Sequence, residues 1–160
     1  MIAYFMMKIL VSIGLILTLR HLLTRINQIE IIYYYLIVTS LLQIVPNIIV
    51  LNLELIKIQQ SIIIIPILQA DRLIILPILT LWMLYLHKKL YGRYLVNFII
   101  TVIWTFSFIG LTILNKAMDV ITFHGWNIGI GLVEMLCIYA LLIGFYIIFQ
   151  SILRKEMDIK

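Results

Sequence analysis

The stretch YLVNFIITVIWTFSFIGLTIL, residues 94–114, decides the fold class, because it is almost wholly apolar and contains no Asp, Glu, Lys or Arg. A helix rises about 1.5 Å per residue, so a run of about 20 apolar residues crosses a hydrocarbon core roughly 30 Å thick. Runs of similar length recur along the whole chain. We therefore expect about five transmembrane helices, at residues 2–19, 31–53, 71–87, 94–114 and 128–150.

The composition leaves no room for a separate soluble domain. Of the 160 residues, 64% are hydrophobic and 12% are charged, whereas soluble domains are about half apolar and about one quarter charged. The spans must be helices, since lipid offers no partners for the backbone groups of an open strand edge. The sequence thus predicts an all-α integral membrane helical bundle, with residues 1–160 forming a single transmembrane domain.

The positive residues predict how the chain crosses the membrane. In a five-span arrangement, two of them, Lys57 and Lys116, fall on one side. The eight that fall on the other side are Arg20, Arg25, Lys88, Lys89, Arg93, Arg154, Lys155 and Lys160. Because cytoplasmic loops carry an excess of Lys and Arg, we expect the C-terminus in the cytoplasm and the N-terminus outside. Lys8 lies inside a span, and we expect its ammonium to extend toward the headgroups.

The net charge of +5 does not indicate binding to nucleic acid. The lysines and arginines lie between apolar spans, where they set the orientation and meet anionic lipid headgroups. The expected partners are therefore the lipid bilayer and either another membrane protein or a second copy of the chain, with no nucleic acid.

Residues 51–62 predict an amphipathic helix that lies flat on the outer leaflet. Apolar residues repeat at helical spacing on one face and polar residues occupy the other. The apolar face comprises Leu51, Leu55, Ile58 and Ile62, and the polar face comprises Glu54, Lys57 and Ser61. The overlapping segment 61–69, around Pro66, is either interfacial or re-entrant, because non-helical backbone is tolerated at membrane depth where protein or water covers it.

Three polar residues of the second span, Ser40, Gln43 and Asn47, share one helix face beside Pro46. Such a face typically forms a seam of interhelical hydrogen bonds, each contributing about 0.5–2 kcal/mol. The alternative is that this face lines a path for a solute. A proline removes a backbone hydrogen bond and kinks a helix, which is also what a hinge requires.

A second group of polar residues gathers near the predicted outer boundary. Glu134 lies about 9 Å inside the span that begins at Ile128, and a carboxylate at that depth requires a cation, a hydrogen-bond network or a proton. The residues that we assign to one polar pocket on this side are Asn47, Asp71, Arg72, His124, Trp126, Asn127 and Glu134. The alternative is that Glu134 pairs with Arg72 or Lys116 and only locks helices together.

The sequence contains no familiar catalytic or metal-binding pattern. The single cysteine, Cys137, excludes an internal disulfide and a cysteine-based zinc cluster, and His124 has no second His or Cys at ligand spacing. The HExxH, GxSxG, P-loop and dinucleotide motifs are absent as well. We therefore predict no catalytic residues, no metal and no cofactor, although a membrane enzyme can lack these motifs.

Four features of the chain from Asp71 onward occur together. They are Asp71 at the head of a span with Pro77, the basic turn HKKLYGR at residues 87–93, a span with Trp104, and FHGWNIG at residues 123–129. In these features the chain resembles an uncharacterised family of small multi-span membrane proteins of endospore-forming Firmicutes, which has a His and then Gly-Trp-Asn before its last span. The family often has one more residue after the His, whereas none intervenes here. The resemblance implies a bacterial cytoplasmic-membrane protein and implies no activity.

Three functions fit these features. The first is a non-catalytic accessory or sensory membrane component whose extracytoplasmic polar pocket engages a partner or a small ligand, since catalytic residues are few and no soluble domain is expected. The second is a small transporter or channel subunit that uses Glu134, Asp71 and the second span with Pro46. The third is a membrane-embedded enzyme that acts near the outer headgroups through His124, Glu134 and Asp71.

Overall fold

The computed structural model describes residues 1–59 and 62–157, and five apolar segments in it form helices long enough to cross a membrane. This confirms the predicted all-α bundle and fits a multi-pass membrane protein. The helices are α1 (Ile2–Leu23), α2 (Gln28–Asn47), α3 (Ile64–Ala70), α4 (Leu76–Lys89), α5 (Tyr94–Ala117) and α6 (Ile128–Met157). The shorter elements are the π-helical turns η1 (Ile48–Asn52) and η2 (Asp71–Ile75) and the strands β1 (Ile56–Ile58) and β2 (Ile121–Phe123).

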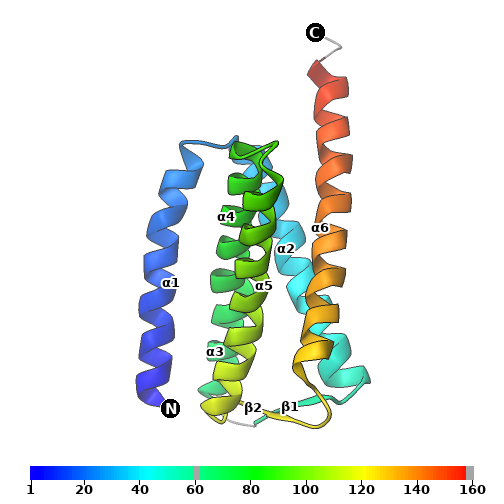
Figure 1. Cartoon of the computed structure of the whole chain (residues 1–160). Coiled ribbons are helices and arrows are strands. Elements are labelled where there is room, and N and C mark those ends of the chain that lie inside the picture. The colour runs from blue at the N-terminus through cyan, green and yellow to red at the C-terminus, as the bar shows by residue number, and fades with distance from the viewer. Residues whose placement is uncertain (60–61, 158–160) are drawn as a thin grey trace.

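The third span is the centre of the bundle. It consists of α3, η2 and α4 in direct succession, and it packs against α1, α2 and α5 (Figure 1). In the most apolar 18 residues of this span 44% of the residues are buried, whereas 17% are buried in the corresponding stretches of α1 and α5. The span begins at Ile64 and is therefore longer than the predicted 71–87, because the helix around Pro66 continues into it. Within the described residues of the segment 61–69, the chain is thus a turn and the start of a spanning helix.

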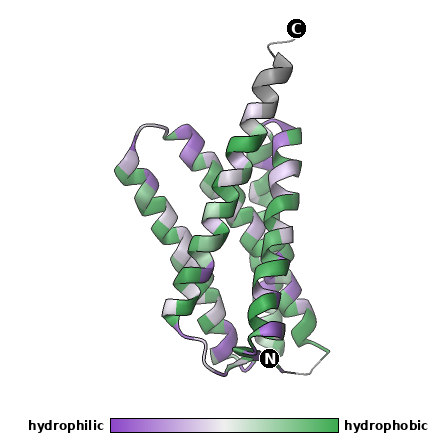
Figure 2. Cartoon of the chain, turned by 90° about the vertical axis from the view of Figure 1, so that its right-hand side faces the viewer, coloured by the Kyte–Doolittle hydropathy of each residue, from purple (hydrophilic) through white to green (hydrophobic). Residues whose placement is uncertain are grey.

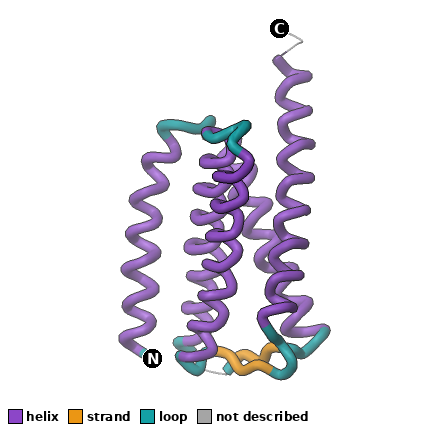
Figure 3. The backbone as a smooth tube through the Cα atoms, in the orientation of Figure 1, coloured by secondary structure: helices purple, strands orange, loops and turns teal. Residues whose placement is uncertain are grey.

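The expected interfacial helix at residues 51–62 is wrong in the part that the structure describes. The chain ends η1 at Asn52, takes a left-handed conformation at Glu54 (φ 51°), and forms β1, which pairs antiparallel with β2. In the register of this pair, Lys57 lies opposite Thr122. The backbone of β2 supplies hydrogen-bond partners from the loop between α5 and α6, so the segment does not need helical bonds of its own. Figure 3 shows the strand pair closing one end of the bundle.

A proline lies two residues from each π-helical turn. Pro46 precedes η1 and Pro77 follows η2. Proline has no backbone N–H and clashes with the carbonyl four residues earlier, which disturbs the regular helical hydrogen bonds. In the case of Pro77 that carbonyl belongs to Leu73, and the hydroxyl of Tyr35 on α2 donates a hydrogen bond to it at 2.6 Å. A side chain of the neighbouring helix thus replaces the bond that Pro77 cannot make.

The two ends of the bundle differ in the elements that form them. The N-terminus and the strand pair lie at one end, and α6 runs out of the bundle at the opposite end (Figure 1). Lys57 on β1 and Lys116 near the end of α5 belong to the first end, which we call the N-terminal end.

Between the ends the helices present mostly hydrophobic residues (Figure 2), such as Leu10 and Leu17 of α1, exposed by 68% and 69%. Apolar surface of this extent suits contact with lipid.

Candidate binding site at the N-terminal end of the bundle

A cavity with a volume of about 90 Å³ lies between α2, the third span, α5 and α6, beneath the strand pair. Its wall is mainly apolar. The polar residues that line it are Asp71, Arg72, Thr112, Asn115 and Glu134. A single buried water needs roughly 10–15 Å³ by this kind of measure, so the cavity has room for several waters or for a small polar ligand.

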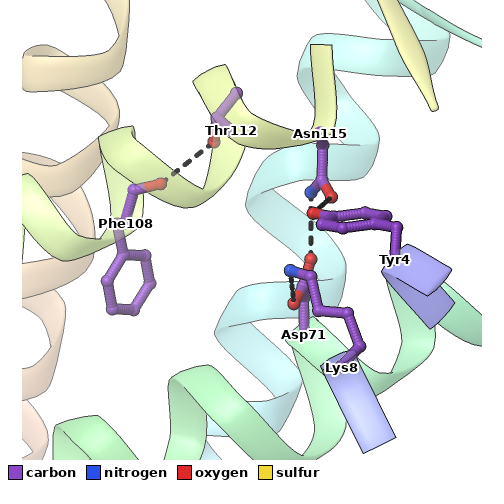
Figure 4. A network of polar contacts seen from close by, with 6 residues as sticks. All are labelled: Tyr4, Lys8, Asp71, Phe108, Thr112 and Asn115. Atoms are coloured by element: carbon purple, nitrogen blue, oxygen red, sulfur yellow. Dashed lines mark hydrogen bonds and ion pairs between the residues drawn. The ribbon is translucent and has the colours of Figure 1, made fainter. Parts of the chain in front are cut away.

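One side of the cavity is a closed polar network that begins at Asp71 (Figure 4). The ammonium of Lys8 donates to Asp71 Oδ1 at 2.5 Å, and Asn115 Nδ2 donates to Asp71 Oδ2 at 2.9 Å. The hydroxyl of Tyr4 donates to Asn115 Oδ1 at 2.7 Å. Both carboxylate oxygens are therefore occupied and the negative charge is balanced, which is what a buried carboxylate in a membrane requires.

The position of Lys8 corrects the expectation that its ammonium reaches the headgroups. Its side chain is 2% exposed, because α1 packs against η2 and brings it to Asp71. Lys8, Tyr4 and Asn115 were not assigned to the site from the sequence. The signal that was available is that Lys8 and Asp71 are opposite charges in two different apolar runs, and such charges pair far more often than they face lipid.

The other side of the cavity carries Arg72 and Glu134. Arg72 Nη1 donates to Asn47 Oδ1 at 3.0 Å, its one hydrogen bond to a described side chain. A guanidinium has five N–H donors, so most of them remain available. Glu134, on α6, interacts electrostatically with Arg72, but the two are not in direct contact as an ion pair. Two opposite charges thus face the same cavity with space between them.

The predicted pocket residues fall into two groups. Asp71, Arg72 and Glu134 line the cavity, and Asn47 accepts a hydrogen bond from Arg72. The other three lie near the strand pair and do not line the cavity. The first of these is Trp126, which is buried close to Glu134 but whose Nε1 has no hydrogen-bond partner among the described residues. The second is Asn127, whose Oδ1 accepts from Ile130 N at 3.0 Å, and the third is His124, which is exposed.

His124 is held away from the cavity by its backbone. Its N–H donates to Leu55 O at 2.8 Å, which continues the ladder between β1 and β2. The grouping of His124, Glu134 and Asp71 that an enzyme would need is therefore not assembled, since Asp71 is also occupied by Lys8. Thr112 offers no activated hydroxyl either, because it donates to Phe108 O of its own helix at 3.2 Å (Figure 4).

The polar face of α2 makes two contacts with the third span. Gln43 Nε2 donates to Gln69 Oε1 at 3.1 Å, and Asn47 accepts from Arg72. Ser40 instead donates to Leu36 O within α2, at 2.8 Å. The hydrogen bonds of Gln43 and Asn47 therefore fix the height of α2 relative to the wall of the cavity.

No group of three or more His, Cys, Asp or Glu residues that could hold a metal ion occurs in the described part of the chain. The fold and the cavity together define a class, namely a multi-pass helical membrane protein with a charged cavity inside the bundle. Comparison of the chain with protein-family models, with curated proteins and with solved structures finds no match.

Proposed function

We propose that this protein is a non-catalytic membrane component that binds a small zwitterionic ligand in the cavity at its N-terminal end. The observation that carries the proposal is that Arg72 and Glu134 line the same cavity but do not form an ion pair with each other. The guanidinium suits a carboxylate or phosphate group of the ligand, because it can donate two parallel hydrogen bonds. Glu134 suits an ammonium group.

The charge balance of the cavity favours a ligand with no net charge. Asp71 is neutralised by Lys8, so the charges left to face the cavity are those of Arg72 and Glu134, one of each sign. A zwitterion placed between them satisfies both without adding net charge. A simple anion or cation would leave one buried group uncompensated, at a cost of several kcal/mol.

The proposal places the site on the extracytoplasmic side of a bacterial cytoplasmic membrane. Its support is the excess of positive residues at the end of the bundle opposite the cavity, which predicts that end in the cytoplasm, and the resemblance to membrane proteins of Firmicutes. Most of the chain forms membrane-spanning helices. We therefore propose that binding of the ligand is sensed by a membrane-protein partner or by a second copy of this chain, as in an accessory or sensory subunit.

The experiment is a binding measurement on the purified protein in nanodiscs of phosphatidylglycerol, which has no zwitterionic headgroup. Glycine and glycerophosphoethanolamine are expected to raise the unfolding temperature, whereas acetate and ethylammonium are not. Arg72→Gln and Glu134→Gln should each weaken binding at least about tenfold, which corresponds to about 1.4 kcal/mol. Lys116→Gln, at the same end but exposed, is the matched control and should bind normally.

Nanodiscs of phosphatidylethanolamine separate a free ligand from a lipid headgroup. If the headgroup occupies the cavity, these nanodiscs raise the unfolding temperature of the wild type and abolish the response to glycine. If the ligand is a free solute, the response to glycine is the same in both lipids. A response to acetate that equals the response to glycine, or binding that survives both substitutions, would overturn the proposal.

A further inference from the structure

A second cavity lies at the opposite end of the bundle, between α4, α5 and α6, with a volume of about 230 Å³. It reaches the loop after α4, where Tyr91 is 93% exposed. Its polar lining includes His87, whose Nε2 is 3.2 Å from the hydroxyl of Thr101, and Asn97, whose Oδ1 is buried without a hydrogen-bond partner in the described chain. The second cavity therefore offers polar groups to an incoming solute.

A layer of buried apolar side chains lies between the two cavities. Four buried residues of α5 and α6 form it, and they are Trp104, Phe108, Met135 and Ile138, between 1% and 6% exposed. Phe108 and Met135 line the first cavity, while Leu142 of the same apolar cluster lines the second. On α6 the step from Met135 to Tyr139, another residue of the second cavity, is a single helical turn of about 6 Å.

Trp104 is the central member of this layer. Its ring lies 4.8 Å from the ring of Phe108 and 6.0 Å from that of Tyr139, so it contacts the lining of both cavities. Its Nε1 donates to the hydroxyl of Thr80 on α4 at 3.0 Å, which holds the indole across the gap between α4 and α5. Trp104 has the largest side chain of the four, so its rotation would change the layer more than that of any other member.

The first cavity is also bordered by the irregular parts of two spans. Pro46 and η1 on one side and η2 on the other contribute to its wall. Segments of this kind are the places where spanning helices bend and where functional sites form. A change of helix direction there can be transmitted to Phe108, which belongs to both the cavity wall and the layer, and to Leu42, which lines the cavity and belongs to the same apolar cluster.

We propose that the two cavities are the two ends of one pathway through the bundle, and that the layer around Trp104 is its gate. The class of solute rests on the proposed function and is the small zwitterion of the first cavity. The pathway adds passage of this solute across the membrane to its binding. The gate itself is inferred from the packing of α4, α5 and α6 alone, so its test does not require a known solute.

The test measures whether a reagent can cross the layer. All variants carry Cys137→Ser and are placed in sealed vesicles. A membrane-impermeant cationic methanethiosulfonate is added on the side of the N-terminal end, and the rate at which it modifies Leu142→Cys is measured. Thr112→Cys, in the first cavity, reports access from that side. We expect Thr112→Cys to react quickly and Leu142→Cys slowly. Adding Trp104→Ala should raise the rate at Leu142→Cys at least about tenfold.

Trp82→Ala is the matched control, because Trp82 on α4 also donates to a threonine, Thr18 of α1, at 3.0 Å, but lies outside the layer. It should leave the rate at Leu142→Cys unchanged. Phe108→Ala, which thins the same layer from α5, is the second variant if Trp104→Ala does not fold. Equal rates with Trp82→Ala and Trp104→Ala, or no increase in either folded gate variant, would overturn the pathway. Binding of glycine that persists in that case would leave the proposed function intact.

Discussion

Lys8 of α1 and Asp71 of η2 form an ion pair whose side chains are only 2% and 5% exposed, with Nζ and Oδ1 2.5 Å apart. This pair is the strongest polar link between α1 and the rest of the bundle. Because α1 buries few of its apolar residues, dispersion contacts alone hold it weakly. The attachment of α1 therefore depends on the ion pair between its Lys8 and Asp71 of the third span.

Lys8→Met tests this attachment. The substitution leaves Asp71 buried without its cation, and removing one partner of a buried pair typically costs about 3–5 kcal/mol. We expect the free energy of unfolding in detergent, followed by tryptophan fluorescence, to fall by that amount. Lys8→Met combined with Asp71→Asn should recover part of the loss, because no charge then remains uncompensated.

Lys116→Met provides the comparison for that experiment. Lys116 lies over the ring of Phe123 at 4.6 Å but is exposed, so its removal should cost less than about 1 kcal/mol. A cost at Lys8 no larger than the cost at Lys116 would show that the ion pair does not stabilise the attachment of α1.

Tyr35→Phe tests the replacement of the backbone bond that Pro77 lacks. Loss of the hydroxyl leaves Leu73 O without this donor, and interhelical hydrogen bonds in membranes average about 0.6 kcal/mol. In the Pro77→Ala background the alanine N–H is available to the same carbonyl, so Tyr35→Phe should cost less there. The measurement is a double-mutant cycle of unfolding free energies, with Tyr33→Phe as the control. Costs that add without coupling would contradict this account.

The spans were predictable because hydropathy is a local property. A run such as residues 94–114 must cross the membrane whatever its neighbours do, and the structure has a helix there. The strand β1 was not predictable in this way. Residues 51–62 repeat with helical spacing, but the backbone partner that makes 56–58 a strand lies at 121–123, far along the chain.

The candidate site was predictable only in part, because it too depends on contacts between residues that are far apart in the chain. A buried carboxylate needs a partner, and this rule drew attention to Asp71 and Glu134 individually. Which cation each one meets depends on helix packing. Lys8 reaches Asp71 because α1 lies against η2, and Arg72 stays apart from Glu134 because the cavity separates them. Neither relationship follows from the spacing of residues along one helix.

The orientation in the membrane is tested by labelling single cysteines in intact bacteria that express the protein. On the Cys137→Ser background, an impermeant maleimide should modify Lys57→Cys directly and Lys89→Cys only after the cells are permeabilised, because both positions are exposed but lie at opposite ends of the bundle. Leu10→Cys, in the lipid-facing part of α1, should react in neither case. The reverse pattern for Lys57→Cys and Lys89→Cys would place the cavity on the cytoplasmic side.

Gly131→Ala tests the support of Glu134 by Trp126. A Cβ atom at Gly131 would lie 2.7 Å from Trp126 Cζ2, so the buried indole must shift. Overpacking of this kind costs about 1–3 kcal/mol. The shift should change tryptophan fluorescence and weaken binding of glycine, since Trp126 lies close to Glu134, although its Nε1 makes no hydrogen bond among the described residues. Gly144→Ala, on the same helix with nothing within 4 Å of its Cβ position, should leave binding unchanged and stabilise α6 slightly. If both variants bind glycine like the wild type, Trp126 does not position Glu134 and the ligand contacts must be sought on the Arg72 side of the cavity.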